Sequence, residues 1–216
     1  MEISKGILES YPMKPFRISL FLSSYLVLLS YSICTLLAYL HYRLAYSPIN
    51  NWLSDLGNKI SNPTGAIYYN AGILISAIWL MMFFIGFSIV KSRKNRIQKL
   101  MVFLTQFFGL IGCASMALSA FFTIDNPRPH SFLSAVLYIS LGTAFAFSVA
   151  ALRYNPKWPR WLLLLGVLAA LFDLLASIFF NNVPVFEWIT VSLFLAYVVL
   201  TGVSLRSPRT LGVINA

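Results

Sequence analysis

The sequence is poor in charged residues, and acidic side chains are the scarcest of them. Only 10% of the 216 residues are charged, with six Asp and Glu, two His and two Cys. Soluble domains contain about 25% charged residues, so this composition excludes a soluble fold. Both cysteines lie in apolar runs, which argues against a disulfide framework. Because no zinc, Walker-type, Rossmann or Gly-x-Ser-x-Gly pattern occurs, we expect neither a metal nor a cofactor.

Apolar residues are abundant instead, at 59% of the chain with a mean hydropathy of +0.78. A transmembrane helix needs about 20 such residues, and strands of a membrane barrel would alternate between polar and apolar side chains, which these runs do not. The sequence therefore predicts an all-α integral membrane protein, a six-transmembrane-helix bundle in one domain spanning residues 1–216. The expected helices cover residues 18–42, 66–90, 99–123, 131–152, 161–180 and 186–205.

Basic residues are distributed unequally between the two ends of these helices, thirteen against three. Because Lys and Arg near helix ends stay in the cytoplasm, we expect both termini to be cytoplasmic in a multi-pass protein of the cell membrane. The minority side holds Arg43, Lys59 and Arg128. The net charge of +10 is explained by this placement, so we expect membrane lipids, and other membrane subunits, as partners and no nucleic acid.

The longest connection, residues 43–65, is amphipathic. Its apolar residues Trp52, Leu53 and Leu56 are suited to the outer membrane interface, and we expect a short helix there, over the mouth of the bundle. Small residues recur in the third and fourth predicted helices, including Gly109, Gly112 and Gly142. Since small residues let helices approach closely, we expect these two helices to form the tightest pair.

Four of the six acidic residues and both histidines gather towards the outer side, together with Asn70. We expect one polar pocket there, lined by His41, Asp55, Asn70, Asp125, His130, Asp173 and Glu187. Asp173 lies about 18 Å into its helix, where an ionisable group is costly unless it is paired or neutral. It should face the bundle interior, either as a hydrogen-bonded structural residue or as a proton acceptor or ligand contact.

The turn from Asp125 to His130 contains two prolines and places a carboxylate, the Arg128 guanidinium and an imidazole together. Such a turn is suited to binding a headgroup phosphate or assisting hydrolysis, with Asp125, His130 and Asp173 as candidate catalytic residues. The alternative is a capped helix N-terminus with Arg128 solvated.

Several short motifs resemble a known family. The segment Asn51-Trp52-Leu53-Ser54-Asp55-Leu56-Gly57, then Asn70, then Phe122-Thr123-Ile124-Asp125 and His130, is similar to the small prokaryotic six-helix membrane proteins of the domain-of-unknown-function nine-nine-eight family. Thr123 stands where that family often has proline. The resemblance implies a six-helix fold and a site at Ser54, Asp55, Gly57, Asn70, Asp125 and His130, but no activity.

Three function classes remain open. The leading hypothesis is a non-catalytic lipid-binding or scaffolding protein, or an accessory subunit of a membrane complex, because no complete catalytic arrangement is present. The alternatives are an outward-facing lipid hydrolase or transferase that uses Asp125, His130 and Asp173, and a small proton-coupled transporter centred on Asp173 and Asn70.

Overall fold

The computed structural model describes residues 14–92, 95–179 and 183–206. Six long helices are joined by short connections, and two of these connections contain a single turn of 3₁₀-helix, η1 and η2. The elements are α1 (Lys14–Leu40), η1 (Leu53–Gly57), α2 (Gly65–Gly86), η2 (Phe87–Val90), α3 (Arg96–Ser119), α4 (Pro127–Leu152), α5 (Arg160–Phe179) and α6 (Pro184–Arg206).

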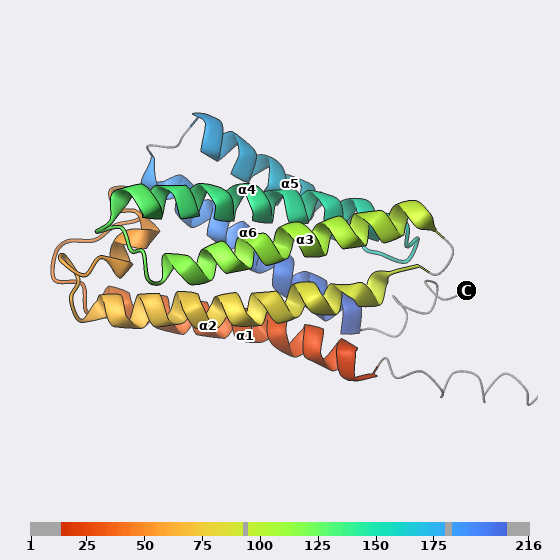
Figure 1. Cartoon of the computed structure of the whole chain (residues 1–216), viewed down its shortest axis with the longest axis horizontal. Coiled ribbons are helices and arrows are strands. Elements are labelled where there is room, and N and C mark those ends of the chain that lie inside the picture. Colours follow the sequence, from red (N-terminus) through yellow and green to blue (C-terminus); the bar gives the residue numbers. More distant parts are fainter. Residues whose placement is uncertain (1–13, 93–94, 180–182, 207–216) are drawn as a thin grey trace, which may run out of the picture.

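The six long helices are all long and apolar enough to cross a membrane, and no strand occurs in the described ranges. This confirms the predicted all-α membrane fold. Each helix packs on its neighbour in sequence, and α6 returns to α1, so the six helices form a closed ring (Figure 1). One end of the ring carries η1 and the α3–α4 turn, and we call it the capped end.

Helix boundaries differ from the predicted ones where polar residues start or stop a helix. The third helix begins at Arg96 rather than 99, because the Asn95 side chain accepts the Gln98 N–H at 2.9 Å and caps it. The fourth begins at Pro127 rather than 131, since proline is suited to the first helical position. The residues from Pro127 to His130 are therefore the first turn of α4 and not a loop. Residue 180, the expected end of the fifth helix, lies outside the described ranges.

The second helix begins at Gly65, one residue before its predicted start, and Asn62 in the preceding turn bonds to its first N–H groups. The Asn62 carbonyl accepts the Ala66 N–H at 2.8 Å, and its side chain accepts the Gly65 N–H at 3.2 Å. Asn62 is fully buried. The residue therefore satisfies the free N–H groups of the first turn from inside the protein.

Small residues of α3 and α4 do not make one common contact. A side chain at Gly109 would meet Phe84 of α2, one at Gly112 would meet Leu141 of α4, and one at Gly142 would meet Asp173 of α5. The helices α3 and α4 do pack extensively on each other, as expected, but of these three glycines only Gly112 lies at their contact. Each glycine instead admits a different neighbouring helix.

Candidate functional site

The short helix η1 closes the capped end of the bundle. Leu53 and Leu56 are 1% and 0% exposed and belong to the core, so the expectation that they lie in the membrane interface is wrong. Burial of these two leucines is favourable because it removes apolar surface from water, at about 25 cal/mol per Å². The expectation of a short helix over the mouth of the bundle agrees with the structure.

Polar side chains of α6 and α2 hold η1 in place. Glu187 of α6 accepts the N–H groups of Leu53 at 2.7 Å and Ser54 at 3.4 Å. At the other end of η1, the amide of Asn70 in α2 donates to the Gly57 carbonyl at 3.1 Å.

Asn62 adds a further link, because its amide donates both to the Leu56 carbonyl at 2.9 Å and to the Ala38 carbonyl of α1 at 3.1 Å. Both ends of η1 are thus fastened to the bundle.

Asp125 joins two connections at this end rather than forming a catalytic pair. Its two oxygens accept the Lys59 N–H at 3.1 and 3.0 Å, and the Thr123 hydroxyl donates to one of them at 2.9 Å. The α3–α4 turn is thereby tied to the segment before α2. The hydrogen bonds of His130 go to other groups, so these two candidate catalytic residues share no hydrogen bond.

His130 is held by its own helix and the preceding turn. Its Nδ1 lies 3.1 Å from the Phe122 carbonyl, and its Nε2 lies 3.5 Å from the Ser134 hydroxyl. A carbonyl only accepts hydrogen bonds, so Nδ1 carries the proton that it donates to Phe122. In the neutral ring, Nε2 is then an acceptor.

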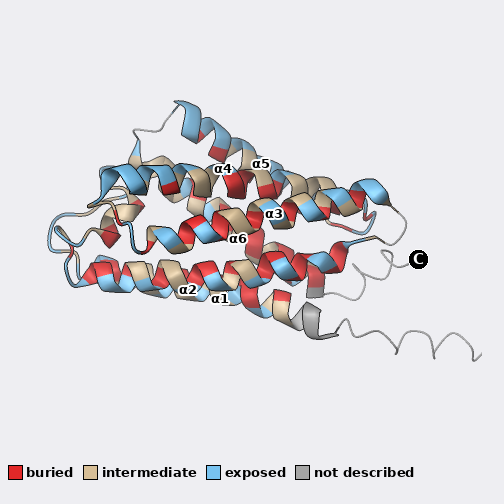
Figure 2. Cartoon of the chain, in the orientation of Figure 1, coloured by how far each residue is buried: buried red, intermediate tan, exposed pale blue. Residues whose placement is uncertain are grey.

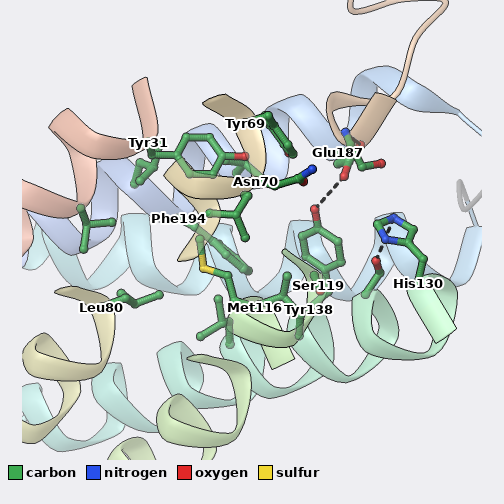
Figure 3. A pocket seen from close by; sticks show the side chains of 18 of the residues that line it. Tyr31, Tyr69, Asn70, Leu80, Met116, Ser119, His130, Tyr138, Glu187 and Phe194 are labelled. Atoms are coloured by element: carbon green, nitrogen blue, oxygen red, sulfur yellow. Dashed lines mark hydrogen bonds between the residues drawn. The ribbon is translucent and has the colours of Figure 1, made fainter. Parts of the chain in front are cut away.

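Two adjoining cavities lie beneath η1, and we call them the inner and lateral chambers. Figure 3 shows the inner chamber, with Tyr138 directed at Glu187 and with Leu80, Met116 and Phe194 at the opposite end. Its volume is about 90 Å³, and that of the lateral chamber is about 590 Å³. Both are lined by Ser54, Ile124, His130, Ser134, Tyr138 and Glu187.

The lateral chamber lies between α4, α5 and α6. Towards Phe179, α5 diverges from α4 (Figure 1), and its diverging end is largely exposed (Figure 2). Ile139 of α4, which lines the chamber, is 62% exposed. The chamber therefore opens on the side of the bundle, between apolar side chains.

Asp173 projects from α5 into this chamber. The residue is 4% exposed and lies about 9 Å from the end of α5, at a rise of about 1.5 Å per residue. A Cβ atom at Gly142 would overlap its Oδ2 atom, so the glycine makes room for the carboxyl group. In the described part of the chain this carboxyl group has no hydrogen-bond or ion-pair partner.

Four of the seven residues expected around one pocket line these chambers: Asn70, His130, Asp173 and Glu187. Asp125, His41 and Asp55 line neither chamber, which corrects the expectation of one common pocket.

His41 is exposed, with Nδ1 2.8 Å from the Leu37 carbonyl and its ring 5.0 Å from that of Tyr68. Asp55 accepts the Trp52 N–H at 2.9 Å; burial raises the pKa of its carboxyl group, and this hydrogen bond opposes the rise.

The other residues of the predicted site take distinct places. Arg128 is exposed and lines neither chamber. Ser54 lines both, and Gly57 packs so closely against Tyr69 and Asn70 that a side chain there would overlap them. Gly57 therefore serves the packing of η1 on α2, and it lines neither chamber.

Sequence reasoning missed Ser134 and Tyr138, which line both chambers. They follow His130 at intervals of four residues, so all three share one face of α4. Tyr138 donates to Glu187 at 3.2 Å, which joins this face to α6. Extending the helical face from His130 would have found both residues.

The lateral chamber offers hydrogen-bond acceptors and hydroxyl groups within apolar walls. Among the described residues, no Lys or Arg lines either chamber, and no group of three His, Cys, Asp or Glu is close enough to hold a metal. The Ser134–His130 contact, at 3.5 Å, is longer than an ordinary hydrogen bond to nitrogen. The arrangement is suited to holding a polar head and an apolar body, without a strong nucleophile–base pair.

The comparisons with known proteins agree with the fold and leave the activity open. Searches of curated proteins and of solved structures gave no match. A family model described as "Protein of unknown function (DUF998)" matches residues 26–204, which include all six helices at least in large part. The residues that fasten η1 and the α3–α4 turn lie within this match. The chain belongs to the DUF998 family of membrane proteins of unknown function.

Proposed function

We propose that this protein binds one membrane amphiphile in the lateral chamber and has no catalytic activity of its own. The observation that carries the proposal is the cavity of about 590 Å³ between α4, α5 and α6. Ligand sites are typically concave, of about 300–1,000 Å³, and mostly apolar with a few convergent polar groups. Ala135, Ile139 and Ala176 supply apolar wall, while Asp173 and Thr190 supply polar groups.

A lipid-like ligand is favoured because the chamber is reached from the side of the helix bundle. Around the opening, Ile139 and Val183 are 62% and 37% exposed, and the outer face of α5 bears exposed Leu171, Leu174 and Leu175. A molecule dissolved in the bilayer can enter between such side chains without crossing a polar barrier. Its alkyl chain then lies along α5, and its head reaches Asp173.

Binding is favoured over hydrolysis because of how the candidate catalytic groups are used. Both oxygens of Asp125 accept the Lys59 N–H, and His130 is oriented by a backbone carbonyl. A carrier centred on Asp173 and Asn70 is disfavoured because these residues line different chambers, and Asn70 holds η1.

Filling the chamber should remove the bound lipid. Ala176 is 8% exposed and lines the chamber, so Ala176→Phe adds a ring where the amphiphile would lie. We expect the purified wild-type protein to retain one lipid in native mass spectrometry, and the variant to lose most of it. Leu175→Phe, at a position 49% exposed on the same helix, is the matched control and should retain it. Equal lipid occupancy in Ala176→Phe and wild type, with unchanged thermal stability, would reject the proposal.

We also propose that the protein lies in the cell membrane with both termini in the cytoplasm. The support is the unequal distribution of Lys and Arg between the two ends of the helices. The end opposite the capped end holds Lys91, Arg96, Arg153 and Arg160. Further residues predicted for that side, Lys5, Arg93, Lys94 and Arg209, lie outside the described residues. Ile60→Cys, at a position 82% exposed, should react with an impermeant thiol reagent on intact cells, and Lys157→Cys should not. The opposite labelling pattern would invert the orientation.

A further inference from the structure

We propose that the amphiphile bound in the lateral chamber carries a positively charged nitrogen head, as an alkylammonium does. This inference rests on the proposed function and adds the chemical class of its ligand. Three observations support it: the charge of the chamber wall, the lack of a hydrogen-bond or ion-pair partner for Asp173 among the described residues, and the aromatic residues around it.

The ionisable groups of the chamber wall other than His130 are acidic. Asp173 and Glu187 both line it, whereas no Lys or Arg does so within the described ranges. Arg128 is the basic residue closest in sequence to the lining residues Pro127 and His130, but it is exposed and does not line the chamber. A phosphate or carboxylate head would therefore meet two carboxyl groups without a compensating cation. Since like charges placed together cost several kcal/mol, the wall selects against anionic heads.

The two carboxyl groups differ in what they already bind. Glu187 accepts the N–H groups of Leu53 and Ser54 and the hydroxyl of Tyr138. Asp173 has no such donor in the described part of the chain, although it is 4% exposed. An ionisable group within a membrane helix is costly unless it is paired, and such groups mark ligand sites. A positively charged nitrogen is the partner that Asp173 lacks.

The remaining wall is also suited to an ammonium group. Trp52, Tyr138 and Phe186 contribute aromatic rings, and aromatic faces attract cations by about 0.5–2 kcal/mol. The Nε2 atom of His130 and the Thr190 hydroxyl provide further acceptors. Gly142 keeps the Asp173 carboxyl accessible, because any larger residue would occupy its place.

Binding of three probes with the same twelve-carbon chain tests the inference. Dodecylammonium, dodecanol and dodecyl phosphate are titrated into the full chain in maltoside micelles, with dissociation constants measured calorimetrically. We expect dodecylammonium to bind most tightly, and Asp173→Asn to weaken it about tenfold or more while leaving dodecanol unchanged. Asp55→Asn removes a carboxyl group that lines neither chamber and is the matched control.

The outcomes separate this inference from the proposed function. If dodecanol binds as tightly as dodecylammonium, or if Asp173→Asn leaves dodecylammonium binding unchanged, the charged head is rejected and the amphiphile site stands. If no probe binds in a manner sensitive to Ala176→Phe, the proposed function fails as well. A fourth titration with phosphatidylethanolamine tests a membrane lipid as the source of the nitrogen. Its head also contains a phosphate, which this wall disfavours, so we expect it to bind more weakly than dodecylammonium; tighter binding than dodecylammonium would contradict the selection against anionic groups.

Discussion

Replacing Glu187 with alanine is expected to lower the free energy of unfolding by about 2–3 kcal/mol, which is the cost of leaving buried donors without a charged acceptor. The substitution removes the acceptor of Leu53, Ser54 and Tyr138 at once. The η1 helix would then lose its link to α6, so proteolysis between α1 and α2 should also accelerate. Thermal unfolding in detergent should show a decrease in Tm of about 5–10 °C.

Two variants on the same helix show whether the effect comes from these hydrogen bonds. Glu187→Gln keeps one acceptor oxygen and should lose less than half as much stability. Ser192→Ala removes an exposed hydroxyl that bonds only within α6 and should be nearly silent. A Glu187→Ala protein as stable as Ser192→Ala would contradict the role of Glu187 in holding η1.

Replacing Asn62 with alanine is also expected to have a large effect, lowering the free energy of unfolding by about 2–4 kcal/mol. Asn62 is 0% exposed, and its side chain satisfies the carbonyls of Ala38 and Leu56 and the N–H of Gly65. Alanine would leave the Leu56 carbonyl and the Gly65 N–H buried without these partners, and the Ala38 carbonyl with only the His41 N–H at 3.3 Å. Water cannot replace the lost amide without opening the contact between α1, η1 and α2.

Asn126→Ala is the matched control for this substitution. Asn126 is exposed and its side chain makes no capping hydrogen bond to α4. Chemical or thermal denaturation should therefore separate the two asparagine variants by several degrees. Equal stability of both variants would mean that the carbonyls of Ala38 and Leu56 find other partners.

The helices could be predicted from the sequence because hydropathy along the chain decides which segments cross a membrane. The start of α2 was predicted to within one residue, whereas the start of α4 was not, because Pro127 was assigned to the turn before the helix. The inward direction of Leu53 and Leu56 was not readable, because an amphipathic segment is equally suited to the membrane interface and to the top of a bundle. Only the contacts with Glu187 and Asn70, distant in sequence, decide between the two.

The candidate site could be predicted only in part, because some of its contacts join residues distant in sequence. Asp173 stood out because a carboxyl group within an apolar helix must face the interior, and the structure has it buried. The partner of Asp125 could not be predicted, since the bond to the Lys59 backbone N–H depends on how two loops meet. The lateral chamber likewise depends on the angle at which α5 leaves α4, and no local sequence pattern encodes this angle (Figure 1).

The family motifs acquire a physical explanation from these contacts. Leu56 fills the core, Gly57 admits Asn70, and Thr123 and Asp125 fasten the neighbouring turn. These residues maintain the capped end above the chambers. Six motif residues also line a chamber: Trp52, Ser54, Asn70, Thr123, Ile124 and His130.

The most direct test of amphiphile binding in the lateral chamber is to locate the bound lipid. A structure of the protein in lipid nanodiscs, determined at a resolution that separates side chains from lipid, should contain one elongated density entering between α4 and α5. We expect its head to lie within hydrogen-bond distance of Asp173 and its chain to contact Ile139 and Ala176. A lateral chamber filled by protein side chains, or lipid only on the outer faces of the helices, would contradict it.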